Sequence, residues 1–129
     1  MGRMFIALVA ALVAGACTSN SRNVSVAKGT WGGRNIELQV GDAEATAQFK
    51  CGAVGHVNGR LDLDASAHFA APGTYDPKLV AGGPRAAYYS GSLSGRRLSL
   101  SVEVDQTEIG PFELQQAQKG SFDVCNFSQ

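Results

Sequence analysis

Short segments in which apolar and polar residues alternate make up most of this chain of 129 residues. In the clearest of them, 97–104, apolar residues at every second position form one face. A period of two is typical of a β-strand with one buried face, and no segment beyond residue 28 shows a helical period. The candidate strands are 35–40, 45–51, 56–64, 68–71, 86–93, 97–104, 110–116 and 121–127. Eight short strands about ten residues apart predict an all-β fold, either a small antiparallel up-and-down barrel or a sandwich, because closure or stacking hides strand edges.

The same alternation predicts which side chains fill the interior. Trp31 lies between glycines and is expected to close one end of the core. Tyr88 and Tyr89 are adjacent and must face opposite sides of their strand, so one of them is expected to be exposed. Turns are expected at 41–42 and 94–95, where glycine is present. The predicted core residues are Ile36, Leu38, Phe49, Leu61, Leu63, Leu98, Leu100, Val102 and Leu114.

The N-terminus has the layout of an export signal. Arg3 precedes an apolar run, 5–14, of about ten residues, whereas a membrane-spanning helix needs roughly 20. We therefore expect residues 1–16 to form a signal peptide that is removed. The segment 13–17, Val-Ala-Gly-Ala-Cys, resembles the bacterial lipobox, in which small residues precede a cysteine that receives a diacylglyceryl group. The resemblance implies lipidation of Cys17 and a membrane anchor; cleavage by ordinary signal peptidase, which would release a soluble protein, is the alternative.

Domain boundaries and location follow from this N-terminus. Residues 17–28 are small and polar without an apolar period, so we expect the lipidated cysteine and a flexible tether there, followed by a single β domain over 29–129. Thr18 occupies the position after Cys17 at which lipoproteins held in the inner membrane carry aspartate. The resemblance therefore implies the bacterial cell envelope, with the protein lipid-anchored in the outer membrane and facing the periplasm.

Three cysteines occur in the chain. An exported protein meets an oxidising compartment, in which the cysteines of a folded domain pair. Once Cys17 carries lipid, Cys51 and Cys125 remain, and we expect one disulfide between them; two buried free thiols are the alternative. In a closed barrel the second and eighth strands lie about 9–10 Å apart across the first, whereas bridged cysteines keep their Cα atoms within about 7 Å. A flattened barrel or a frayed first strand is the expected solution.

Several short motifs carry a further resemblance. They are Gly-Thr-Trp-Gly-Gly at 29–33, Ala-Gln-Phe-Lys-Cys at 47–51, Gly-Thr-Tyr at 73–75, Gly-Gly-Pro at 82–84, Tyr-Ser-Gly-Ser-Leu-Ser-Gly at 89–95 and a cysteine near the end. Together they resemble a group of small, uncharacterised bacterial lipoproteins and secreted β proteins, with which no activity is associated. A weaker likeness is to the periplasmic inhibitors of C-type lysozyme, which are also small, disulfide-bridged barrels. Phe49, Cys51 and Cys125 carry that likeness, while the inhibitors' Ser-Gly-x-x-Tyr loop has no match here.

Charge and motifs exclude several function classes. Removal of the signal takes away Arg3 alone of the charged residues and leaves ten Lys and Arg against eleven Asp and Glu, so there is no basic field for nucleic acid. No serine lies in a nucleophile elbow, and we predict no catalytic residue. Four residues at even positions would share one face of an unbroken strand: His56, Asp62, Asp64 and His68. Because no short His-x-His or Cys-x-x-Cys spacing accompanies them, we expect neither a metal nor a cofactor.

The segment 72–85 is the best candidate for an interaction. It is rich in Pro and Gly and, at about 14 residues, longer than the usual connection in a compact domain. Long loops on rigid sheets often carry binding function. The candidate contact residues in it are Tyr75, Asp76, Lys78 and Arg85.

The sequence therefore predicts a lipid-anchored binding or interaction module of the cell envelope without catalytic activity. Its expected partners are the membrane, through the N-terminal lipid, and an envelope protein or a small ligand. The alternatives are a protein inhibitor of an envelope or host enzyme and a barrel that binds a small ligand. A deep apolar interior with one open mouth would favour the small ligand, and a filled core with an exposed tyrosine-bearing loop would favour a protein partner.

Overall fold

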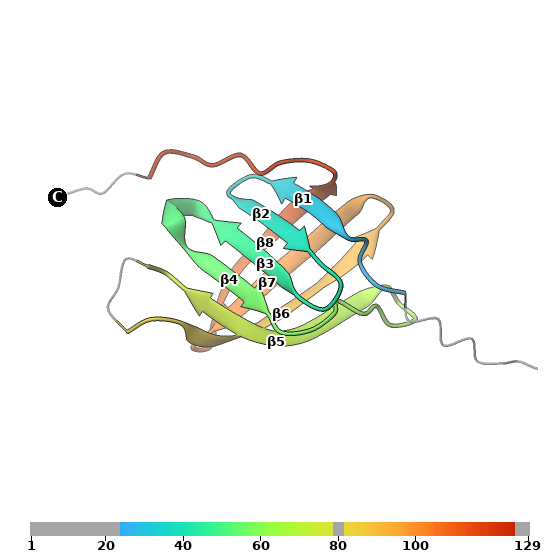
Figure 1. Cartoon of the computed structure of the whole chain (residues 1–129), viewed down its shortest axis with the longest axis horizontal. Helices are drawn as coiled ribbons and strands as arrows, with labels where there is room; N and C mark the ends of the chain where they lie inside the picture. The colour runs from blue at the N-terminus through green and yellow to red at the C-terminus, as the bar shows by residue number, and fades with distance from the viewer. Residues whose placement is uncertain (1–23, 79–81, 126–129) are drawn as a thin grey trace, which may run out of the picture.

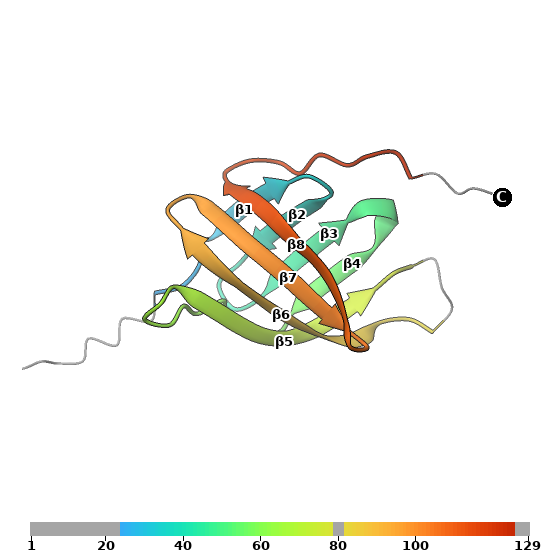
Figure 2. The same ribbon diagram turned by 180° about the vertical axis from the view of Figure 1, so that it is seen from behind.

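The computed structural model describes residues 24–78 and 82–125. In it, eight antiparallel strands each pair with the next along the chain, and the pairing of β8 with β1 closes them into a barrel (Figures 1 and 2). The strands are β1 Gly29–Gly33, β2 Ile36–Val40, β3 Ala45–Phe49, β4 Val54–Val57, β5 His68–Asp76, β6 Arg85–Ser94, β7 Arg97–Val104 and β8 Thr107–Gln116. One short 3₁₀ turn, η1 Lys50–Gly52, lies between β3 and β4. The prediction of a small all-β, up-and-down barrel is confirmed.

The predicted signal peptide and Cys17 lie outside the described residues and stay predictions. Within the described part of the chain, no helix is long and apolar enough to cross a membrane.

Tight hairpins set the register of the barrel. Three connections consist of two residues each, at 34–35, 95–96 and 105–106. Both residues of 105–106 have positive φ, 50° and 66°, which is the backbone of a type I′ turn and matches the twist of the strands it joins. The predicted turn at Gly41 is present, with the Gly41 amide donating to the Glu44 carbonyl at 2.8 Å. The strand alternation and the turn residues therefore fix the same register.

The predicted core is confirmed at eight of its nine positions, and Leu63 alone, in the connection between β4 and β5, is half-buried. Trp31 is 1% exposed, and its Nε1 donates to the Ala27 carbonyl at 2.9 Å. Tyr89 is fully buried while Tyr88 is 48% exposed, as the alternation requires.

Two large rings fill the barrel because glycines lie opposite them. A Cβ atom at Gly55 would overlap the Tyr89 hydroxyl, and one at Gly73 would lie 3.0 Å from Cε2 of the same ring. A Cβ atom at Gly91 would lie 2.9 Å from the Phe69 ring. The Tyr89 hydroxyl donates to a backbone carbonyl of β5 at 2.6 Å, and burial raises its pKa, so it stays a neutral donor. These positions leave no room even for a methyl group, and side chains fill the interior.

The folded domain begins earlier than predicted. The segment 24–28, expected to be part of the tether, packs against the connection between β4 and β5. The Val26 amide donates to the Leu61 carbonyl at 2.9 Å, the Leu63 amide donates to the Val24 carbonyl at 2.7 Å, and Val26 is 2% exposed. The predicted boundary at residue 29 is therefore wrong by at least five residues, because two valines are too short an alternation to indicate a strand. The rest of the predicted tether lies outside the described residues.

Two of the predicted strands differ most in length from those in the structure. The third, expected at 56–64, is β4 and stops at Val57, shortly before Gly59 takes a φ of 142°. Asp62 then forms only an isolated bridge to Ser25. The fourth, expected to stop at Ala71, continues to Asp76 and pairs with β6 along its length. Pro72 lies within this strand and did not end it.

The prediction of a strand at 121–127 is wrong. Ser121 forms one parallel bridge with Arg34, and the chain up to Cys125 makes no further ladder. The place of an eighth strand is taken instead by β1, whose three glycines give it too little alternation to be recognised.

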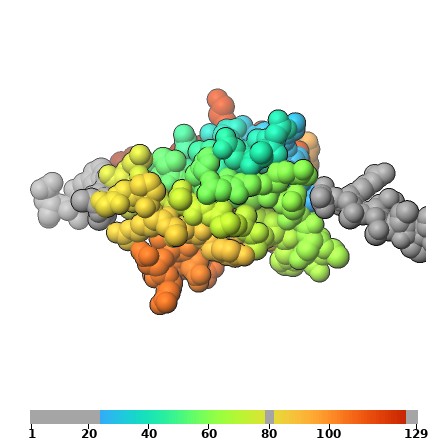
Figure 3. All heavy atoms as spheres, turned by 60° about the horizontal axis from the view of Figure 1, so that its bottom comes forward, coloured from blue at the N-terminus to red at the C-terminus, as the bar shows by residue number. Residues whose placement is uncertain are grey.

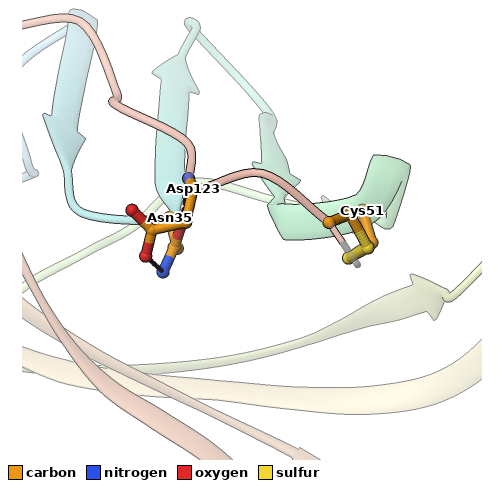
Figure 4. Close-up of a disulfide and its surroundings, with 4 residues drawn as sticks. Asn35, Cys51 and Asp123 are labelled. Carbon is orange, nitrogen blue, oxygen red and sulfur yellow. Dashed lines mark hydrogen bonds between the residues drawn. A yellow bond between two sulfur atoms is a disulfide. The ribbon is translucent and has the colours of Figure 1, made fainter. Parts of the chain in front are cut away.

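The C-terminal segment 118–125, which we call the strap, crosses the outer face of the β1–β2 hairpin (Figures 1 and 4). It ends at the predicted Cys51–Cys125 disulfide, which is confirmed, with the two Cα atoms 5.3 Å apart. Cys51 lies in η1 and is half-buried, because the strand expected at 45–51 ends at Phe49. Because Cys125 lies on the strap and not on a strand, neither a flattened barrel nor a frayed strand is needed to bring the sulfurs together.

Candidate functional site

The barrel has two different ends. The loop end carries the connections 34–35, 50–53, 77–84 and 105–106, and the entry end carries the other connections and the start of the described chain at Val24. In Figure 1 the entry end lies toward the right and the loop end toward the left. The segment 24–28 and the β4–β5 connection cover the entry end. The predicted contact residues lie at the loop end.

The predicted interaction loop is shorter than expected. Tyr75 and Asp76 are the last two residues of β5, and Arg85 is the first residue of β6. The connection between them is 77–84, and residues 79–81 of it lie outside the described part of the chain. Three of the four predicted contact residues are thus held on strands instead of in a loop, and only Lys78 lies in the connection.

The structure brings Tyr75 and Arg85 together. They are directly opposed across β5 and β6, and both line a hollow of about 290 Å³. The Arg85 guanidinium binds the Asp105 carboxylate at 2.9 Å on the rim. The hollow is lined by Tyr75, Pro77, Arg85, Val104, Asp105, Thr107 and Ile109. Figure 3 shows the residues of the β5–β6 end in yellow beside the orange residues of the β7–β8 end.

Aromatic packing holds the wall of this hollow. The Tyr75 ring lies edge-on to the Phe49 ring, with 5.2 Å between the ring centroids, and Phe49 lies 5.7 Å from the Phe112 ring. Burial raises the pKa of the Tyr75 phenol, which therefore stays neutral and can donate a hydrogen bond at neutral pH. The result is a rigid, mostly apolar surface with one donor and one ion pair at its edge.

Asp76 and Lys78 do not join this surface as a separate binding pair. The Lys78 amide donates to Oδ1 of Asp76 at 2.9 Å, and the Lys78 ammonium lies 3.5 Å from Oδ2 of the same carboxylate. This turn lets Lys78 take a φ of 65°. Both residues therefore shape the start of the β5–β6 connection.

Sequence reasoning missed the contribution of the β7–β8 hairpin to the hollow. Asp105, Thr107 and Ile109 are 20–34 residues from Arg85 and Tyr75 in sequence, and the strand alternation places Ile109 on the same face as the core. The signal that could have found them is the closed up-and-down order itself, because it places all alternate connections at one end.

The four residues considered for a metal are spread over separate contacts. Nε2 of His56 lies 3.2 Å from the Glu44 carboxylate, and Asp62 accepts a hydrogen bond from Ser25 at 2.8 Å. Asp64 accepts the amides of His68 and Ser66 at 2.9 and 2.8 Å, and these hydrogen bonds lower its pKa. The four candidate residues therefore do not share an unbroken strand. Within residues 24–78 and 82–125, no three His, Cys, Asp or Glu side chains form a metal-binding group.

Comparison of the chain with models of known protein families, with curated proteins and with solved structures finds no match. The geometry of the loop end is therefore the basis for a functional proposal.

Proposed function

We propose that this protein is a lipid-anchored binding module of the bacterial cell envelope, which contacts a protein partner through its loop end and has no catalytic activity. The observation that carries the proposal is the hollow of about 290 Å³ between the ends of β5–β6 and β7–β8. Its apolar wall and its rim ion pair, Arg85–Asp105, have the composition of an interface centre: an aromatic and aliphatic pocket with Arg beside it.

The lipid anchor and the hollow are expected at opposite ends of the domain. Cys17 precedes Val24 by seven residues, which can span at most roughly 25 Å when extended. Val24 lies at the entry end, so a lipid on Cys17 keeps that end near the membrane. The loop end then faces away from the bilayer, where another envelope protein can reach it.

The filled interior favours a protein partner over a small ligand held inside the barrel. Tyr89 and Phe69 occupy the space that a ligand cavity would need, and glycines lie directly against their rings. Small-ligand sites in barrels of this size depend on an unfilled interior. The hollow at the loop end is shallow by comparison and suits one or two side chains of a partner.

Photo-crosslinking on native membranes tests this proposal. A photoreactive residue at Thr107, an exposed position that lines the hollow, should give a discrete crosslinked protein that is lost when Tyr75→Ala removes the ring from the wall. Tyr88→Ala is the matched control, because Tyr88 is an exposed tyrosine on the outer wall of β6. Circular dichroism of each variant checks that the barrel is formed.

Two results would overturn the proposal. Equal loss of the crosslink in Tyr75→Ala and Tyr88→Ala would remove the hollow as the contact surface. Unchanged fatty-acid labelling and membrane binding of a Cys17→Ser protein would remove the lipid anchor.

A further inference from the structure

The strap is held at the surface of the barrel without entering its core. The Ser121 amide donates to the Gly33 carbonyl at 3.0 Å, and the Asn35 amide donates to the Ser121 carbonyl at 2.6 Å. The Gly120 amide donates to the Glu37 carboxylate at 2.9 Å. Every residue of the strap is exposed or half-buried, so these contacts are polar and open to water.

The core is complete without the strap. Among the described residues, the buried apolar side chains run from Val26 to Leu114, and the half-buried ones packed against them end within the same range. The barrel is closed by β8 and β1 through the pairs Trp31 with Gln116 and Gly33 with Leu114. These pairs involve no residue of the strap. Local release of a segment that buries no apolar side chain costs little compared with unfolding of the barrel.

Apart from the backbone that joins it to β8, the disulfide is the one covalent connection between the strap and the rest of the described barrel. Cys51 has a φ of 67°, a left-handed conformation that a non-glycine residue rarely takes without a constraint. A hollow of about 250 Å³ lies directly beside Cys51 and is lined by Phe49, Ala53 and Phe122 among others. Phe122 is 43% exposed there, so the strap does not seal the hollow. The sulfur of Cys51 is therefore open to an approaching thiolate.

We propose that the Cys51–Cys125 bridge is a redox-controlled latch, which on reduction releases residues 118–125 from an otherwise intact barrel. The reductant is a dithiol, such as the reduced site of a thiol–disulfide oxidoreductase. Its thiolate attacks the Cys51 sulfur, the bond between Cys51 and Cys125 breaks, and the Cys125 thiolate leaves and takes up a proton. The second thiol of the reductant then displaces Cys51 from the mixed disulfide, so the dithiol is oxidised to a disulfide and both cysteines become thiols.

Release of the strap uncovers a specific strip of the β1–β2 hairpin. A Cβ atom at Gly32 would overlap the backbone of residues 118–120, so the absence of a side chain at this position allows the strap to lie directly against β1. The Gly33 carbonyl and the Asn35 amide lose Ser121 as their partner at the same time. The latch therefore controls access to the backbone of β1 at Gly32, with one free backbone acceptor and one free backbone donor beside it.

Hydrogen exchange measured by mass spectrometry tests the latch. The full chain carrying Cys17→Ser, which leaves only the two bridge cysteines, is compared oxidised and after reduction by dithiothreitol, a small dithiol. We expect exchange in peptides covering 118–125 to rise at least roughly tenfold on reduction, while peptides of β6 and β7 stay at least roughly a hundredfold more protected than the strap, because they still exchange only through unfolding of the barrel. A chain that carries Cys51→Ser and Cys125→Ser in addition has no cysteine, and it should show the pattern of the reduced protein in the absence of any reductant.

The contrasting outcomes overturn the proposal. Equal protection of the strap and of β6–β7 after reduction, or failure of the double-serine chain to fold, would show that the bridge holds the whole barrel and not the strap alone. Unchanged exchange of the strap after reduction, with both thiols titratable, would show that the surface hydrogen bonds hold the strap without the bridge. An oxidised Arg34→Ala chain is the control, because it removes a strap contact but leaves the bridge. It should keep the strap peptides protected to within about threefold.

Discussion

Removal of the Cys51–Cys125 bridge should lower the free energy of unfolding by about 4.4 kcal/mol. The two cysteines are 74 residues apart in sequence, and closing a loop of that length restricts the unfolded chain by this amount in the chain-entropy relation. Because the strap buries no side chain, the native state loses little when the bridge is cut, and the effect on the unfolded chain dominates. For a domain of this size, the change corresponds to a melting temperature lower by on the order of 20 °C.

Urea unfolding of the oxidised Cys17→Ser chain and of the same chain with both bridge cysteines replaced by Ser measures this difference. The variant should also show a larger m-value, because an unfolded chain without the cross-link exposes more surface. Free-thiol titration of the denatured, unreduced Cys17→Ser chain should give close to zero and establishes that the starting material is bridged. A difference in unfolding free energy below about 1 kcal/mol, at equal m-values, would refute the assignment of the effect to the unfolded chain.

Two further predictions concern single side chains. Tyr89→Phe should lower the free energy of unfolding, measured in urea, by about 0.5–1.5 kcal/mol, because the buried hydroxyl donates to the Thr74 carbonyl at 2.6 Å. Tyr88→Phe on the exposed face should change the free energy of unfolding by less than about 0.5 kcal/mol. Equal effects of the two substitutions would contradict the burial of the Tyr89 hydroxyl. Protonation of Asp123 in acid should loosen the strap. Hydrogen bonds from Asn35 and then Arg34 hold the pKa of the Asp123 carboxyl below the usual 3.8. The carboxylate therefore stabilises the attached strap above that pH, and this stabilisation is lost as the pH falls through the folded-state pKa. Exchange of strap peptides relative to β6–β7 should therefore rise below about pH 4, and Asp123→Asn should abolish this pH dependence.

The parts of the fold that were predictable from sequence are those decided by neighbours in the chain. The row from Leu98 to Val104 is a continuous alternation, and it forms β7 with the expected face buried. Tyr88 and Tyr89 are separated by the same rule, since adjacent residues on a strand face opposite sides. The glycine-bearing turns set the hairpins for the same reason. Local pattern and local backbone preference were sufficient at each of these places.

The parts that were missed depend on contacts between distant segments. Nothing near Val26 indicates burial, and it is buried because Leu61 and Leu63 lie beside it in the barrel. Pro72 reads as the start of a loop, yet β5 continues through it, because a proline at a position that does not donate to a neighbour does not interrupt pairing. Likewise, the hollow at the loop end depends on Ile109, which only the closed strand order brings to Tyr75.

The strand count shows how a correct total can rest on two opposite errors. The segment 29–33 was not counted because its glycines give no alternation, although the absence of side chains is what lets it serve as β1 beneath the strap. The segment 121–127 was counted because its residues alternate, although Gly120 and Ser121 attach it across the hairpin at 34–35 and not along an edge. The same arrangement answers the distance problem of the disulfide. A cysteine on an eighth strand of the barrel would be too far from Cys51, whereas a cysteine on a strap that crosses the hairpin reaches it, and this crossing is possible because Gly32 allows the chain to lie against β1.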